Sequence, residues 1–95
     1  MNSSGENLKE ELGKLRASMV KLPEADGYLR LFDDFLEHHE FGLALVMVCD
    51  YLLEPAVPQT DAATIEKIHL LQVGLGIEDD YVERLQTKAS LRDSR

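Results

Sequence analysis

The chain has 95 residues, of which 18 are Asp or Glu and 10 are Lys or Arg, and its formal net charge is −8. This length fits one domain with a modest core, and 44% hydrophobic residues fit a globular protein. The acidic balance argues against a nucleic-acid partner. No apolar run approaches the roughly 18 residues of a membrane span. We therefore expect one acidic domain that binds neither nucleic acid nor membrane.

Two features of the sequence bear on the cellular compartment. Residues 1–6 lack the basic and then apolar order of a signal peptide. Cys49 is the one cysteine, so no disulfide bond can form within the chain. Both features predict a cytoplasmic protein.

Apolar residues at helical spacing predict two helices in the first part of the chain. The first covers about residues 4–21 and stops before Pro23; its apolar positions are Leu8, Leu12, Leu15, Met19 and Leu22. The second covers about residues 25–39. One broad face of it holds Tyr28, Leu31, Phe32, Phe35, Leu36 and His39, and the opposite face holds Arg30, Asp33, Asp34 and Glu37.

The third predicted helix, about residues 41–54, is apolar nearly all round, which favours burial as the central helix over exposure at an interface. Pro55 and Pro58 bracket the loop that follows. Thr60 or Asp61 can cap a fourth helix, which Gly74 and Gly76 end. Its apolar stripe is Ile65, Ile68, Leu71 and Leu75.

A last short helix follows the carboxylates Glu78, Asp79 and Asp80, which suit the positive end of a helix dipole. Its apolar anchors are Tyr81, Val82 and Leu85. Residues 88–95 are basic and polar and are predicted to fray. The fold class is therefore all-α, a small irregular bundle of four to five short helices, with residues 1–87 as the single domain.

Histidine and acidic side chains near the end of the second helix are candidate metal ligands: Asp34, Glu37, His38, His39 and Glu40. Asp34 and His38 lie four residues apart and share a helix face. The other histidine, His69, has no neighbouring ligand in the sequence, and a site built from one helix usually needs a second pair. We expect no metal and no cofactor; His38 is then solvated, and His39 closes the helix end.

Enzymatic chemistry has weak candidates. Cys49 lies in an apolar helix, where burial raises a thiol pKa and makes the group inert. Asp33 and Glu37 could act as an acid–base pair, but on an exposed helix face they lack a pocket. Gly74 and Gly76 form a helix stop and not a phosphate loop. We expect no enzyme.

Charge segregation is the strongest functional signal. Between Glu24 and Glu54 there are eight carboxylates and one basic residue, Arg30. On the second helix, like charges three and four residues apart repel by about 0.2–0.5 kcal/mol each. A solvated helix surface usually mixes its signs, as the first helix does. This pattern favours a surface that binds a basic protein, and binds it fast.

Two segments resemble the MafI family and related immunity proteins of bacterial contact-dependent inhibition systems. The first is Leu36-Glu37-His38-His39-Glu40-Phe41-Gly42-Leu43-Ala44-Leu45, with Asp50-Tyr51-Leu52 after it. The second is the closing element Gly74-Leu75-Gly76-Ile77. The resemblance covers about residues 29–85, and its motifs are structural. His39 stands where the family often has Gly.

The resemblance implies small acidic helical proteins that neutralise a cognate toxin domain, often a nuclease, by tight binding. The family transfers no interface residues, so charge alone nominates them: Asp33, Asp34, Glu37, Glu40, Asp50, Glu54, Asp79 and Asp80. An acidic helical adaptor or regulatory subunit of another complex is the alternative. Whether a toxin would be blocked at its active site or at an exosite stays open.

Overall fold

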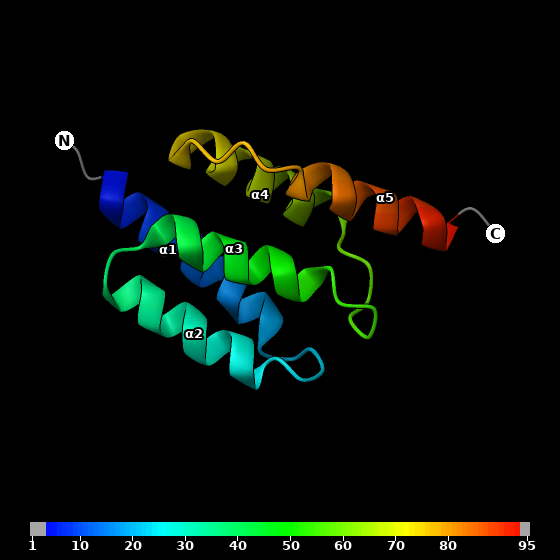
Figure 1. Ribbon diagram of the computed structural model, residues 1–95, viewed down its shortest axis with the longest axis horizontal. Helices are drawn as coiled ribbons and strands as arrows, with labels where there is room; N and C mark the ends of the chain where they lie inside the picture. Colours follow the sequence, from blue (N-terminus) through cyan, green and yellow to red (C-terminus); the bar gives the residue numbers. More distant parts are fainter. Residues whose placement is uncertain (1–3, 94–95) are drawn as a thin grey trace.

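Five α-helices and no strand make up the part of the chain that the structure describes (Figure 1). The structure, a computed structural model, describes residues 4–93, with side chains for residues 7–90. The helices are α1 (Ser4–Met19), α2 (Asp26–Glu37), α3 (Phe41–Leu52), α4 (Ala62–Leu75) and α5 (Tyr81–Asp93). The predicted all-α bundle of short helices is confirmed. No helix within residues 4–93 combines the length and the apolar character that a membrane crossing requires.

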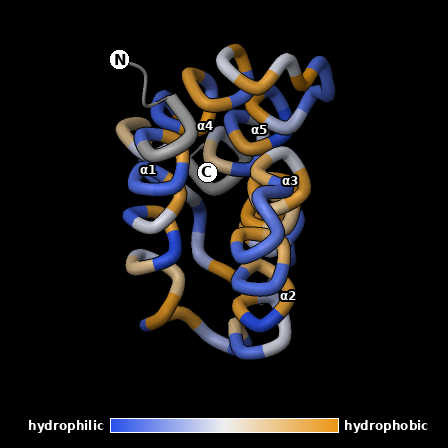
Figure 2. The backbone as a smooth tube through the Cα atoms, turned by 90° about the vertical axis from the view of Figure 1, so that its left-hand side faces the viewer, coloured by the Kyte–Doolittle hydropathy of each residue, from blue (hydrophilic) through white to orange (hydrophobic). Residues whose placement is uncertain are grey.

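Helix α3 is the centre of the fold, as its apolar composition predicts, and it contacts each of the other four helices. Its buried residues are Ala44, Leu45, Val48, Cys49, Tyr51 and Leu52. Helices α1 and α2 pack on one side of α3, and the α4–α5 hairpin packs on the other (Figure 2). The Cα atoms span only 18 Å along the shortest axis, so the outer helices keep one face in solvent.

The core is built from positions that the helical spacing selects, with one correction on α2. Leu12, Leu15 and Met19 of α1 are at most 3% exposed, and Phe32 of α2 is fully buried. Leu31 was assigned to the apolar face of α2, but it is 49% exposed, and Leu29 is buried in its place. The inward face of α2 is therefore narrower than the sequence pattern indicates.

Two helices end in the same backbone motif. After α2, the N–H of His39 donates to the carbonyl of Leu36 and that of Glu40 to the carbonyl of Phe35. After α4, Gly76 and Ile77 bond to Val73 and Gln72 in the same way. This motif needs a left-handed residue, and φ is 59° at His39 and 73° at Gly76. Gly adopts this conformation freely, whereas a side chain is strained there.

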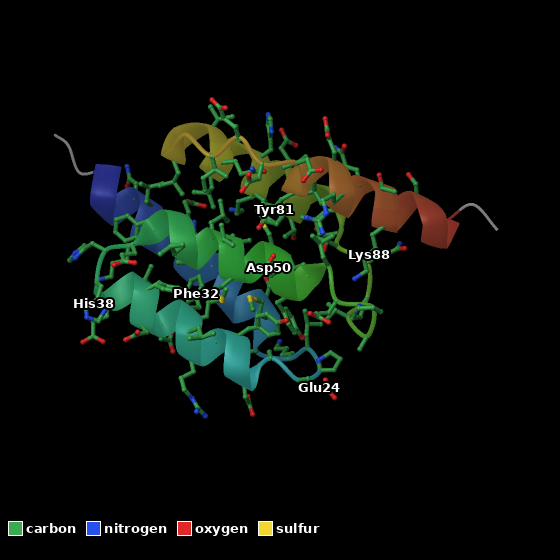
Figure 3. All side chains as sticks on the ribbon, in the orientation of Figure 1. Glu24, Phe32, His38, Asp50, Tyr81 and Lys88 are labelled. Atoms are coloured by element: carbon green, nitrogen blue, oxygen red, sulfur yellow. The ribbon has the colours of Figure 1, made fainter. Side chains whose placement is uncertain are left out.

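Helix α5 does not fray where the sequence predicts. It continues to Asp93, so the predicted polar tail of residues 88–95 is wrong for residues 88–93; residues 94–95 lie outside the described range. The Lys88 Nζ donates to the carbonyl oxygens of Leu52, Glu54 and Val57 at 2.6, 2.9 and 2.8 Å. A cation at the carbonyl end of α3 also faces the negative end of the helix dipole. This contact joins α5 to α3 and extends the domain past residue 87 (Figure 3).

We predict that Lys88→Met lowers the free energy of unfolding by about 2 kcal/mol, because hydrogen bonds to a charged group contribute about 1.5–3 kcal/mol. The methionine keeps the apolar stem and removes the ammonium. Urea unfolding measures the change. Lys21→Met is the matched control, because Lys21 is exposed, and such a surface change stays within about 0.5 kcal/mol. Equal stability of the two variants would contradict the prediction.

His39→Gly should stabilise the protein, because it removes a side chain from a left-handed residue, a conformation that costs about 1–2 kcal/mol. We expect a net gain of about 0.5–1 kcal/mol, since the edge-on contact of His39 with Phe41 is lost. Gly76→Ala is the reverse control. A Cβ there meets no atom within 4 Å, so any loss reports the backbone alone. Thermal unfolding of both variants should give shifts of opposite sign.

Candidate protein-binding site

The acidic face of α2 has a counter-charge that the sequence does not reveal. The Arg16 guanidinium of α1 donates to both carboxylate oxygens of Asp33, with Nε–Oδ1 and Nη2–Oδ2 distances of 2.7 Å. The hydrogen bonds from Arg16 lower the pKa of Asp33, and the bond to Asp33 raises the pKa of Arg16. The repulsion expected between the like charges of α2 is therefore offset at Asp33 by the charge of Arg16.

Asp34, the acid next to Asp33 on α2, lies close to a histidine side chain. The His38 Nδ1 lies 2.8 Å from the backbone oxygen of Asp34 and 3.7 Å from its Oδ1. The backbone contact and the charge of Asp34 raise the pKa of His38. Glu37 and Glu40 are exposed and take part in no ion pair within residues 7–90. Of the five metal-ligand candidates, no three meet, and no other such group forms among the described residues.

Asp50 and Glu54, the predicted acids of α3, lie in a second region. The Tyr28 hydroxyl donates to the Glu54 carboxylate at 2.6 Å, a bond that raises the pKa of Tyr28. Burial first, and then the charge of Asp50, raise the pKa of Tyr81 (Figure 3). Arg84 completes the lining of a hollow of about 330 Å³ here. These two carboxylates therefore have donors of their own close by.

A larger groove, of about 1010 Å³, runs between α4 and α5. Six carboxylates line it: Asp61, Glu66, Glu78, Asp79, Asp80 and Glu83. No Lys or Arg of residues 7–90 lines it, and His69 is its one titratable nitrogen. Aliphatic side chains complete the lining, chiefly Ile65, Val73, Ile77 and Val82. The groove thus combines apolar surface with negative charge on both sides, which suits a basic protein.

Local structure positions these acids. Asp61 accepts a hydrogen bond from the backbone N–H of Thr64 at 2.8 Å and caps α4. Gly76 ends α4, and three consecutive acids then precede α5. Gln72 is 4% exposed, and its Nε2 donates to the backbone oxygen of Asp79 at 3.1 Å, which holds this loop against α4. Asp80 has a distant partner in Arg84, at 3.9 Å.

The structure divides the predicted acids among separate regions and assigns four further acids to the groove. Asp79 and Asp80 line the groove together with Asp61, Glu66, Glu78 and Glu83, which the sequence prediction did not nominate. A signal existed, since residues 61–83 hold six carboxylates and one basic residue, Lys67. The Lys67 Nζ contacts Glu11 of α1 at 3.0 Å, so the one base of this stretch pairs outside the groove.

Cys49 is buried, as predicted, and is a core residue. Burial, followed by the charges of Asp50 and Asp79, raises its pKa to about 12. A thiol with such a pKa carries almost no thiolate near neutral pH, and the thiolate is the reactive form.

No family model, curated protein or solved structure matches this chain. The fold and the surface define it as a small all-α protein with an acidic groove between its last two helices.

We predict that the Arg16–Asp33 pair stabilises the fold in a pH-dependent way. The folded-state pKa of Asp33 is lowered, so the contribution is present above the unfolded value of 3.8 and is lost as the pH falls through the folded pKa. Both side chains are more than a third exposed, so Arg16→Met should cost only about 0.5–1 kcal/mol near pH 7 and almost nothing near pH 2.

Urea unfolding of Arg16→Met, Asp33→Asn and the double variant at both pH values measures the coupling free energy. A coupling of the same size near pH 7 and near pH 2 would show that packing of the Arg16 stem, and not the ion pair, is responsible.

Proposed function

We propose that this chain is an immunity protein that binds the basic surface of a toxin domain, of the nuclease kind, and neutralises it. The observation that carries the proposal is the α4–α5 groove, lined by six carboxylates and by no described Lys or Arg. The resemblance of residues 29–85 to the MafI family supports the particular kind of partner. The site of action in this proposal is the cytoplasm.

The charge of the groove favours a basic protein over the other partner classes. A nuclease carries positive charge where it holds phosphates, and the same charge attracts carboxylates. Glu66, Glu78, Asp79 and Glu83 form no ion pair within residues 7–90, so a basic partner can pair with them without displacing a described side chain. Complementary fields raise association rates, and hydrogen-bonded pairs at the centre of an interface slow dissociation.

In this proposal the interface lies away from the centre of α2. Asp33 is held by Arg16, so a partner would have to displace an existing ion pair to use it. Glu66, Glu78, Asp79 and Glu83 of the groove take part in no ion pair within residues 7–90 and need no such exchange. The other predicted acids are therefore secondary candidates in this proposal: Asp34 and Glu37 of α2, Glu40 just before α3, Asp50 of α3 and Glu54 just after it. Asp79 and Asp80 belong to its main surface.

Co-expression tests the function. The chain should restore growth to bacteria that express the toxin domain encoded beside its gene, and the two proteins should co-purify. Glu66→Lys with Glu83→Lys should abolish protection, because it reverses charge on both helices of the groove. Asp34→Lys with Glu37→Lys is the matched control, with the same change in net charge on exposed positions of α2.

Three outcomes decide between the readings. Protection lost only in the groove variant supports the proposal and its surface. A stable complex that gives no protection supports the alternative of an acidic adaptor or regulatory subunit. Protection that survives the groove reversal but fails with the α2 reversal would return the interface to the second helix.

A further inference from the structure

The residues that line the groove repeat with helical spacing on both walls. On α4 they are Ala62, Ile65, Glu66, His69, Gln72 and Val73, and on α5 they are Val82, Glu83, Gln86, Ala89 and Ser90. Steps of three and four residues mean that each wall is a stripe parallel to its helix axis. The α4 stripe covers about three turns, or roughly 16 Å of helix, and the α5 stripe covers a little over two turns, or roughly 12 Å. A groove with this direction and length matches one short α-helix.

Part of the apolar lining of the groove stays exposed in the described chain. Ile65 is buried in its floor, and Ile77 and Val82 are half-buried beside it. Val73 on the α4 wall is 66% exposed, and Leu70, almost one turn earlier, is 64% exposed. Isolated exposed aliphatic residues are ordinary on a protein surface. Val73, however, lines the groove, where an apolar side chain of a bound helix can cover it.

The acidic side chains stand on both walls and at the end of the hairpin. Glu66 lies on α4, Glu83 on α5, and Glu78 and Asp79 in the connection between them. An occupant that places an apolar stripe on the floor therefore turns its flanks toward carboxylates. Lys and Arg suit these flanks, because their long stems cover apolar surface while their charges reach the acids. Carboxylates on the occupant would be repelled.

The side-chain hydroxyl of Thr60, a residue that lines the groove, lacks a hydrogen-bond partner among the described residues. Thr60 lies just before α4 and is 8% exposed. A buried hydroxyl without a partner costs about 1–3 kcal/mol.

We propose that the α4–α5 groove receives a single amphipathic, basic α-helix of the partner protein. The helix packs its apolar stripe against Val73, Ile77 and Val82 and directs Lys or Arg toward Glu66, Glu83 and the acids of the α4–α5 connection. This inference rests on the proposed function in taking the partner to be a basic protein.

The probe for this site is a synthetic peptide of about 16 residues, with Leu at i, i+3, i+4 and i+7 and Lys at its other positions. Fluorescence anisotropy at low salt measures binding to the whole chain, and backbone NMR shifts locate it. We expect the largest shifts on the groove-lining residues of α4 and α5. One control peptide has the same composition in an order without an amphipathic face, and another has Glu in place of Lys.

Variants of the protein distinguish binding in the groove from non-specific attraction of the basic peptide to the acidic protein. Glu66→Lys with Glu83→Lys should weaken peptide binding by at least about tenfold. Asp34→Lys with Glu37→Lys changes the net charge equally and should weaken it by no more than about threefold, since these acids lie on α2. Val73→Ser removes exposed apolar surface without affecting the core and should weaken binding by several-fold.

Three results would overturn the inference: no binding at millimolar peptide, equal binding of the scrambled peptide, or equal loss in the two double variants. None of them affects growth protection against the toxin, so they leave the proposed function standing. A chain that binds the peptide in the groove but gives no protection would overturn the immunity function alone.

Discussion

The enclosure of α3 is the constraint on which the rest of the structure depends. Its side chains are apolar on nearly every face, so water must be excluded from almost its whole circumference. Two helices cannot achieve this, and the chain uses four, with α1 and α2 on one side and the α4–α5 hairpin on the other. At the carbonyl end of α3, the Lys88 ammonium donates to the backbone oxygens of Leu52 and Glu54.

Three basic side chains of this protein join one helix to another. Arg16 joins α1 to α2 through Asp33, Lys67 joins α4 to α1 through Glu11, and Lys88 joins α5 to the end of α3. In each contact a positive charge is paired within the protein, so it no longer offsets the negative charge elsewhere on an already acidic surface. No described Lys or Arg lines the groove between α4 and α5 to balance its acids. A potential of this kind is a property of the assembled chain, and it acts on partners before contact.

The acidic groove is therefore a consequence of how the core is closed. Because α4 and α5 use their inner faces to cover α3, their outer faces are left to solvent. The two helices run in opposite directions, with their connection lying along α4 and α5 continuing past the start of α4 (Figure 1). The pair is held by the Gly76 turn and by Gln72, so the groove is formed before any partner arrives. A preformed site loses little conformational entropy on binding, which favours affinity.

The sequence by itself determined the helices, their order and the central position of α3, because local spacing and caps act over a few residues. It also determined that Cys49 is buried and that Gly76 ends a helix. The sequence could not predict which charged residues pair, because Arg16 and Asp33 lie 17 residues apart and Lys67 and Glu11 lie 56 apart. The sequence also did not predict how far α5 extends, because Lys88 finds its carbonyl partners only when α5 packs against the end of α3. Only the tertiary structure decided which acids share a surface, because a groove is made by two helices whose contact no local pattern records.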